Sequence, residues 1–354
     1  MNNCPPNFFL LHVSSTESRE IHSFLMNPET GELNLNELIA VPGSGAPTRG
    51  NIPLIWGRDG KVLYAHVRTE PYPISAFLLD SDSRKLQLLE TISMSAPMAY
   101  LSTSLDGRFM LGASYDDALI TVNSIQSNGS LVTLDKQIIS TPPKAHCIIS
   151  APFGRFVYAT SVDGDAILVY SFDEQLGRLV ELEQLRTAAK VGSGPRHLVF
   201  HPLLDYLYCI NEHDGSLTVY SVDQNSGGLR QLQSISLVPH DFKGNALASD
   251  IHITPNGMYI YASVRKTNSI NAFHINAVTG MLSNIGVYEV EANPRGFAID
   301  PSGSFLVCAG QESNHIAVYK IQSNTGHITL LARYPVGKRP SWIEIVSMPN
   351  LKEN

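Results

Sequence analysis

Arginines, one glutamate and one histidine stand at corresponding positions of a repeated sequence pattern, and together they could bind an anion and activate water. The first position precedes an apolar run and holds Ala99, His146, Arg196, Ser249, Arg295 and Ser341. The second position follows a later apolar run and holds Arg68, Tyr115, Val162, Glu212, Arg265 and Gln311. Scaffold positions of a repeat tend to keep their residue type, whereas these two change from unit to unit. We interpret them as two levels of one functional site.

The residue types at these levels suit hydrolysis of a small anionic ester. Guanidinium groups donate paired hydrogen bonds to phosphate or carboxylate and stay charged at neutral pH. Glu212 or His146 could act as general base on water, while a neighbouring arginine stabilises the oxyanion. We favour His146 slightly, because an imidazole titrates near neutral pH and the arginines should lower the pKa of Glu212. No Ser-His-Asp order or nucleophile elbow is evident, which disfavours a covalent acyl-enzyme.

The predicted site consists of a catalytic set and a substrate-binding set. The catalytic set is His146, Glu212, Arg196 and Arg265. The substrate-binding set is Arg68, Arg295, Tyr115, Gln311, Asp250 and His197. Asp250 is also placed to orient a neighbouring arginine. A single arginine of this kind would most simply be a solvated or ion-paired surface residue. The convergence of several arginines on equivalent positions favours a binding site instead.

Other polar residues fit ordinary structural roles. His201 and His252 lie in apolar runs and are expected to be hydrogen-bonded core histidines. Asp116, Asp163 and Asp214 lie in loop segments, where aspartate favours turns. Because no compact ligand motif is present, the sequence predicts no metal site.

The elements that must position these residues are visible as a repeat. Six segments superpose on a turn residue at Gly60, Gly107, Gly154, Leu204, Gly257 and Gly303, about 46 to 53 residues apart, as suits propeller blades. They are GRDGKVLYAHV, SLDGRFMLGAS, APFGRFVYATS, HPLLDYLYCIN, TPNGMYIYASV and DPSGSFLVCAG. A second run with strand-like alternation and a third turn follow in each unit, as in ILVYSF and QLGRLVEL. Each unit therefore contains four strands.

The chain ends predict how the ring closes. The segment 7–15 already has the character of a second strand, whereas 341–348 (SWIEIVSM) resembles a first strand with no followers. Pairing these two segments completes a seventh unit and removes an exposed sheet edge. We predict an all-β chain, a single seven-bladed β-propeller domain over 1–354. Each blade has four antiparallel strands, and the C-terminal strand closes the first blade.

Composition limits the partners and the location. The formal net charge of -7 argues against binding nucleic acid or an anionic membrane surface, so an anion site must be a local cluster. The four cysteines lie far apart without metal-ligand spacing, and the N-terminal segment lacks the features of a signal peptide. We expect a cytoplasmic protein whose partner is a small anion. The sequence leaves the oligomeric state open.

Four strings resemble the propeller-type bacterial 6-phosphogluconolactonases: GSGPRHLVFHP (192–202), ASDIHITPNGMYIYAS (248–263), NPRGFAIDPSG (293–303) and CAGQESNHIAVYKI (308–321). The same superfamily contains fungal carboxymuconate-lactonizing enzymes, whose channel-mouth His, Arg, Glu and Arg resemble His146, Arg196, Glu212 and Arg265. Two departures stand out. Ala145 and Cys147 flank the histidine where the lactonases often have Cys and Ser, and Val264 replaces an acid that commonly precedes the arginine.

The resemblance implies cofactor-free hydrolysis of 6-phospho-D-glucono-1,5-lactone to 6-phosphogluconate in the pentose phosphate pathway. One alternative is a related lactonase or carboxymuconate cyclase that acts on another anionic lactone. An alternative of a different class is a non-catalytic, protein-binding propeller of the WD-repeat kind. The latter is disfavoured because the chain has only two tryptophans and no traceable Gly-His to Trp-Asp unit.

Overall fold

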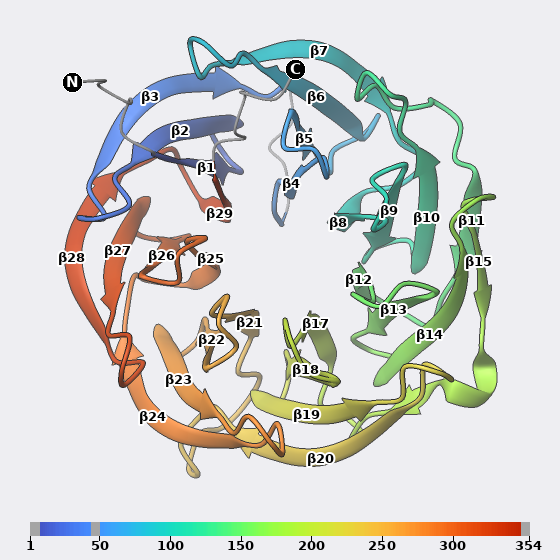
Figure 1. Ribbon diagram of the computed structural model, residues 1–354, viewed down its shortest axis with the longest axis vertical. Coiled ribbons are helices and arrows are strands. Elements are labelled where there is room, and N and C mark those ends of the chain that lie inside the picture. Colours follow the sequence, from blue (N-terminus) through green and yellow to red (C-terminus); the bar gives the residue numbers. More distant parts are fainter. Residues whose placement is uncertain (1–7, 44–49, 348–354) are drawn as a thin grey trace.

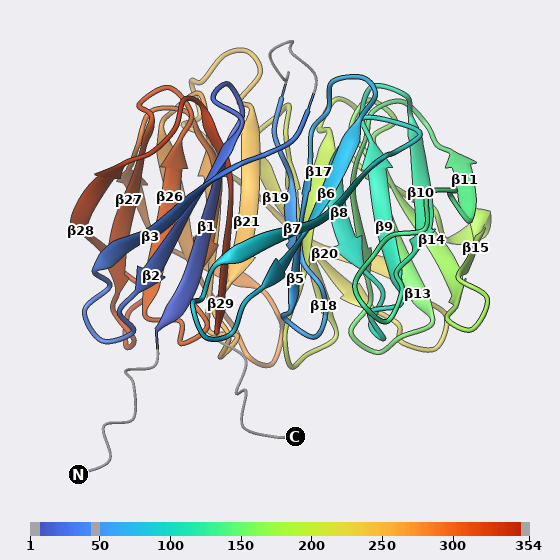
Figure 2. The ribbon, with the colours of Figure 1, turned by 90° about the horizontal axis from the view of Figure 1, so that it is seen from above.

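Seven antiparallel sheets surround a central channel in the computed structural model, which describes residues 8–43 and 50–347 (Figures 1 and 2). Each sheet follows a path of four strands, and we number the sheets blades 1 to 7 in chain order. The all-β prediction and the count of seven blades are confirmed. Within the described ranges the only helix is the short 3-10 turn η1 (Glu183–Leu185) in blade 4.

The strands are assigned by their place in each blade, from the channel outward. The inner strands are β29 (Pro340–Ser347), β4 (Leu54–Trp56), β8 (Met98–Thr103), β12 (Ala145–Ser150), β17 (Pro195–Phe200), β21 (Ala248–Ile253) and β25 (Pro294–Ile299). The second strands are β1 (Phe9–Ser15), β5 (Val62–His66), β9 (Phe109–Ser114), β13 (Phe156–Ser161), β18 (Tyr206–Asn211), β22 (Tyr259–Val264) and β26 (Phe305–Gly310). The third strands are β2 (Glu20–Met26), β6 (Pro73–Leu79), β10 (Leu119–Ser124), β14 (Ala166–Asp173), β19 (Ser216–Val222), β23 (Ser269–Ile275) and β27 (His315–Ile321). The outer strands are β3 (Leu33–Ala40), β7 (Leu86–Ser93), β11 (Gln137–Ser140), β15 (Arg178–Glu181), β20 (Leu229–Ser236), β24 (Leu282–Glu289) and β28 (Ile328–Pro335), and β16 (Thr187–Ala188) also pairs with β14.

The two ends of the described chain close blade 1, as the sequence predicts. Strand β29 pairs antiparallel with β1, so that Ile343 lies opposite Val13 and Val346 lies opposite Leu10. Asn7, the first residue of the predicted pairing segment, lies outside the described residues. The hydrogen bonds of this pair attach the strand that follows blade 7 to blade 1, and they cover the inner edge of β1.

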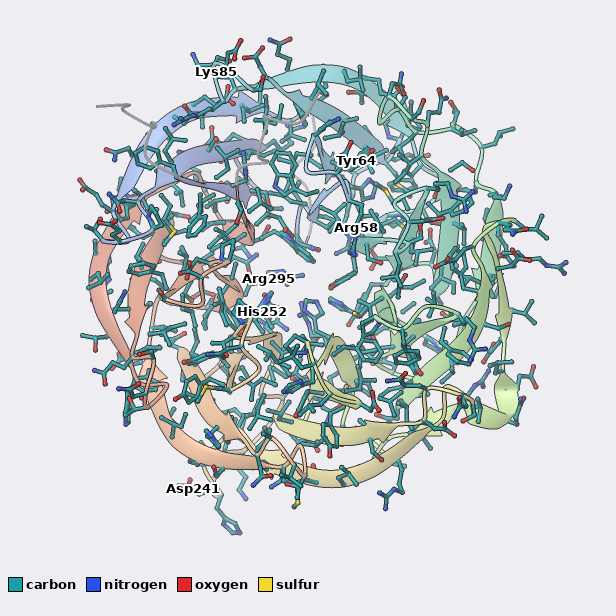
Figure 3. All side chains as sticks on the ribbon, viewed as in Figure 1. Arg58, Tyr64, Lys85, Asp241, His252 and Arg295 are labelled. Carbon is teal, nitrogen blue, oxygen red and sulfur yellow. The ribbon has the colours of Figure 1, made fainter. Side chains whose placement is uncertain are left out.

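Burial explains why the strands differ in sequence. All six residues of β13 (FVYATS) and of β22 (YIYASV) are buried, because both faces of a second strand lie against neighbouring blades. A strand covered on both faces is apolar without alternation, whereas the outer strand β28 is largely exposed. The core therefore lies between blades, as Figure 3 shows for side chains packed around the ring.

A tyrosine-to-glycine hydrogen bond recurs between adjacent blades. Buried hydroxyls donate to backbone carbonyls in the pairs Tyr158–Gly227 (2.8 Å), Tyr208–Gly280 (2.9 Å) and Tyr261–Gly326 (2.8 Å). Gly227 has a φ of 80°, and a Cβ added there would lie 2.8 Å from the ring of Phe156. Only glycine accepts both this backbone conformation and this close approach. In the described part of the chain no helix is long and apolar enough to cross a membrane.

Because β29 closes the ring, shortening one of its buried side chains should destabilise the protein. Ile343 is 4% exposed and packs against Leu11 and Val13, so Ile343→Ala should lower the free energy of unfolding by about 2–5 kcal/mol. Leu35→Ala in the same blade is a matched control, because Leu35 is 60% exposed and should change stability little. Denaturant unfolding compares the two variants. Equal losses would show that β29 is not a structural closing strand.

Candidate functional site

The first-level residues lie in β-bulges at the start of the inner strands. In β17, Pro195 pairs with Asn211 and His197 with Ile210, which leaves Arg196 as the extra residue. In β25 the extra residue is Arg295. The same kind of register shift falls at Ala99, His146, Ser249 and Ser341. A bulge bends its strand and re-aims a side chain, so its repetition around the ring explains why one sequence position serves several blades.

The second-level residues follow the ends of the second strands, which lie beside the starts of the inner strands. Glu212 comes directly after β18, and its backbone N–H donates to the Gly194 carbonyl at 2.7 Å. Arg265 comes directly after β22 and donates its backbone N–H to Leu247 at 3.2 Å. Antiparallel pairing therefore brings the two levels to the same mouth of the channel.

Seven of the ten predicted site residues line one cavity of about 390 Å³. We call it the arginine cavity. Its wall is formed by Gly50, Arg68, Tyr115, Asp116, His146, Arg196, Glu212, Arg265 and Arg295. All four members of the predicted catalytic set are among them. The cavity gathers guanidinium groups from blades 2, 5, 6 and 7 around one buried carboxylate.

The remaining three predicted residues lie behind this wall. Gln311 donates from Nε2 to the Gly50 carbonyl at 3.3 Å and so supports the cavity from outside. His197 and Asp250 line a smaller cavity of about 130 Å³ in the channel. The structure therefore brings neither His197 nor Asp250 into the arginine cavity, although a hydrogen bond connects His197 to it.

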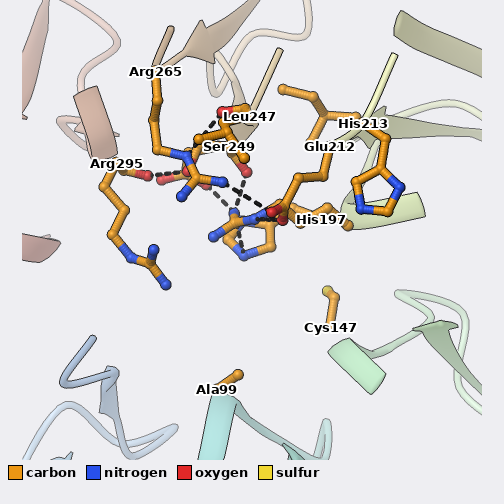
Figure 4. A network of polar contacts seen from close by, with 12 residues as sticks. Ala99, Cys147, His197, Glu212, His213, Leu247, Ser249, Arg265 and Arg295 are labelled. Carbon is orange, nitrogen blue, oxygen red and sulfur yellow. Dashed lines mark hydrogen bonds and ion pairs between the residues drawn. The ribbon is translucent and has the colours of Figure 1, made fainter. Parts of the chain in front are cut away.

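Glu212 joins two of the arginines (Figure 4). Its Oε2 lies 2.9 Å from Arg196 Nε, and its Oε1 lies 3.1 Å from Arg265 Nη2. Burial opposes ionisation of Glu212, but the charges of Arg196 and two further arginines outweigh it and hold the pKa below the ordinary carboxyl value. Burial next to Arg196 lowers the pKa of Arg265 to about 10, which still leaves it charged at neutral pH. Glu212 is therefore an anion held between two cations.

A hydrogen-bonded chain holds Arg196 from the channel side. Arg196 is 2% exposed, and its Nη1 donates to the Ser249 carbonyl and to His197 Nε2, the latter at 3.0 Å. Because a guanidinium can only donate, His197 Nε2 must be the acceptor and its Nδ1 must carry the proton. That Nδ1–H donates to Asp250 Oδ1 at 2.9 Å. The geometry thus fixes the tautomer of His197 and the position of Arg196.

His146 lies in the same wall as a neutral imidazole. Burial, together with the charges of Arg196 and its neighbours, lowers the pKa of His146 well below its ordinary value. This differs from the near-neutral titration assumed from residue type, because the sequence does not show how fully the ring is buried among cations. The ring lies 5.7 Å from Tyr115 and 5.0 Å from His197, centroid to centroid. Its Nδ1 is buried without a hydrogen-bond partner among the described residues.

Two residues of the site were missed from the sequence. Asp116, expected to be a turn former, pairs with Arg68 at 2.8 Å and lines the cavity. Asn51 accepts from Arg68 Nη1 at 3.1 Å and from Arg295 Nη2 at 3.4 Å. The superposition of repeat units in the sequence assigns no first-level residue to blade 2, the blade whose inner strand Asn51 precedes. A search of that blade for polar residues near the equivalent position would have found Asn51.

The residues assigned to structural roles largely have them. His201 bonds through Nε2 to the Gly257 carbonyl at 3.0 Å and is buried. His252 Nε2 lies 3.3 Å from Asp250, but the His252 side chain is 37% exposed and lines the smaller cavity, so the prediction of a core position was wrong for this residue. Asp214 accepts the Ser216 N–H at 3.0 Å in a turn, whereas Asp163 pairs with Lys144 at 2.7 Å. Across 8–43 and 50–347, no group of three or more His, Cys, Asp and Glu side chains is arranged to hold a metal ion.

The fold and the arginine cavity together define a seven-bladed propeller whose channel mouth suits a small anion. The family model described as "Lactonase, 7-bladed beta-propeller" matches residues 7–345. A 6-phosphogluconolactonase of Serratia proteamaculans is 34% identical over 340 residues, which cover 96% of this chain and 99% of the relative. A 6-phosphogluconolactonase of Pectobacterium carotovorum is 34% identical over 291 residues, with 82% and 84% covered.

A solved structure supports the same assignment. The periplasmic gluconolactonase of Pseudomonas aeruginosa superposes with a TM-score of 0.87 at 25% identity, covering 97% of this chain and 100% of that chain. The chain belongs to the family of seven-bladed β-propeller lactonases.

The Glu212 bridge predicts a stability effect that does not depend on activity. Glu212→Gln leaves two buried guanidinium groups without their anion, so it should lower the free energy of unfolding by about 3 kcal/mol. Asp116→Asn is the matched control: the Asp116 side chain is 60% exposed, so this change should cost less than about 1 kcal/mol. Because the folded pKa of Glu212 is lowered, its contribution is present above the ordinary carboxyl value of 4.5 and is lost as the pH falls through the folded pKa. Urea unfolding at pH 7 and at lower pH tests both points, and a Glu212→Gln variant as stable as wild type would contradict the bridge.

Proposed function

We propose that this protein hydrolyses 6-phospho-D-glucono-1,5-lactone to 6-phosphogluconate in the pentose phosphate pathway, without a cofactor. The observation that carries the proposal is the arginine cavity, in which a neutral imidazole faces a carboxylate-bridged arginine pair and two further arginines. An anionic lactone matches this excess of positive charge. The two bacterial relatives named above are 6-phosphogluconolactonases, which supports the same substrate.

His146 is the proposed general base. A water molecule attacks the lactone carbonyl carbon while one of its protons moves to an imidazole nitrogen of His146. The bond from that carbon to the ring oxygen then breaks, and the imidazolium returns the proton to the ring oxygen. The product is a carboxylic acid that ionises in solution. The low pKa of the free enzyme's His146 favours proton return. A bound anion and the developing oxyanion oppose the field of the arginines and raise that pKa during the attack.

Arg196 and Arg265 are the proposed oxyanion-stabilising pair. Both are held by Glu212, and Arg196 is held in addition by Ser249 and His197. Donors fixed before the reaction stabilise developing charge without the cost of reorganising, and such a donor contributes about 10²- to 10³-fold in rate in other enzymes. Glu212 in this scheme positions the pair, because a carboxylate shared by two arginines is a weak base. His197 and Asp250 position Arg196 without touching the substrate.

A cytoplasmic location fits this role. Cys147, Cys209 and Cys308 are buried free thiols, as expected in a reducing compartment. The phosphorylated lactone is also an intracellular metabolite in the proposed pathway. Cell fractionation with an antibody to the protein tests the location.

The direct test of activity is an initial-rate assay with freshly generated 6-phosphogluconolactone, corrected for spontaneous hydrolysis. His146→Ala should lower kcat by about 10²- to 10⁴-fold with a small change in KM, as expected for a lost general base. His240→Ala, an exposed histidine in the loop after β20, is the control and should keep wild-type kinetics. In the wild type, kcat/KM should stay level from pH 8 to below pH 6.5, because protonation of His146 occurs only well below that value.

Two outcomes would change the assignment. A His146→Ala variant with wild-type turnover and the same pH profile would transfer the role of base to Glu212. A wild-type protein that leaves the spontaneous rate unchanged would overturn the proposed function.

A further inference from the structure

The charges of the arginine cavity do not balance. Four arginines line it against two carboxylates, Glu212 and Asp116, and His146 is neutral. Within the described residues this leaves an excess of two positive charges in a partly closed space. Buried cations without anions are costly, so the cavity favours a ligand that carries two negative charges.

Arg295 is the arginine without an anion of its own. Among the residues that the structure describes, no carboxylate lies within ion-pair distance of its guanidinium, and its side-chain hydrogen bond is to Asn51 at 3.4 Å. In Figure 4 no dashed line joins this guanidinium to Glu212. Burial and the charge of Arg265 lower the pKa of Arg295 well below its ordinary value. A bound anion would remove this penalty.

Arg68 is held beside Arg295 by the same amide. Asn51 is 1% exposed, and its Nδ2 donates to the Ala99 carbonyl at 2.9 Å, which fixes Oδ1 as the acceptor for both arginines. Asp116 neutralises Arg68 only in part, because the Asp116 side chain is 60% exposed and the Arg68 side chain 8%. Gly50 has a φ of 86°, and a Cβ there would collide with Arg68 Nη1. The chain thus makes room for two guanidinium groups side by side.

We propose that Arg68 and Arg295, joined by Asn51, form a subsite for the phosphate group of a phosphomonoester substrate. The lactone carbonyl then lies at the other end of the cavity, beside His146, Arg196 and Arg265. This inference rests on the proposed function and assigns the two ends of the same substrate to two pairs of arginines.

The chemistry of a phosphomonoester fits this pair better than that of a single carboxylate. A phosphomonoester carries a charge of about −1.5 to −2 at pH 7 and has three acceptor oxygens, whereas a carboxylate carries one charge and two oxygens. Two forked donors on a shared support match the larger anion. The Glu212 pair is already half neutralised, so it suits the weaker, transient charge of an oxyanion.

Binding of two products separates the two ends of the site. Isothermal titration calorimetry at fixed ionic strength measures the affinity of 6-phosphogluconate and of gluconate, which lacks the phosphate. Wild type should prefer 6-phosphogluconate, and Arg295→Met or Arg68→Met should each reduce that preference by about 10- to 100-fold, the usual range for a lost charge-assisted hydrogen bond. Arg230→Met, an exposed arginine on β20, is the matched control and should keep the wild-type preference. A thermal shift with 6-phosphogluconate reports whether each variant is folded and how far ligand stabilises it.

The outcomes distinguish the subsite from the proposed activity. A variant that weakens both products equally, or neither, would overturn the phosphate subsite even if the wild type hydrolyses the lactone. Loss of the preference in both variants supports the subsite. If wild type shows that preference but no hydrolysis above the spontaneous rate, the phosphate subsite stands and the proposed function fails. A wild type without any preference for the phosphorylated product would also overturn the subsite.

Discussion

Mutual repulsion among four buried or half-buried arginines is the constraint on which the site depends. Glu212 offsets this repulsion for two of the arginines. Its carboxylate lies 2.9 Å from Arg196 and 3.1 Å from Arg265, which makes a compact cation-anion-cation unit. The other two are separated from that unit and fixed through a neutral amide, Asn51. Burial, together with the same field, holds the pKa of His146 well below its ordinary value, so the arrangement that suits an anion also leaves an unprotonated imidazole beside it.

The propeller supplies the rigid frame that this charge arrangement needs. Bulges at the starts of the inner strands place Arg196 and Arg295 at equivalent points of blades 5 and 7. Blade-to-blade packing and the tyrosine-to-glycine hydrogen bonds hold those points apart. Ring closure by β29 completes the frame, since every blade must keep its place for residues from different blades to meet at one mouth.

The fold and much of the site were accessible from the sequence because both repeat. Superposed units gave the seven blades, the closing strand and seven residues that line one cavity. The comparison of repeat units did not identify residues whose role depends on contacts between blades. Asp116 lies in a turn, where aspartate is common, and its pairing with Arg68 depends on two blades meeting in space. The low pKa of His146 could not be predicted from the sequence either, because it comes from burial and from charges that lie far away in the chain. His197 and Asp250 were predicted to bind substrate, but they line a separate cavity behind Arg196.

A crystal structure with 6-phosphogluconate bound tests the central claim, that the two pairs of arginines take the two ends of one dianionic substrate. The account predicts the product carboxylate beside His146, Arg196 and Arg265, with the phosphate within hydrogen-bond distance of Arg295 and Arg68. A product bound in the reverse orientation, or bound outside the arginine cavity, would contradict it.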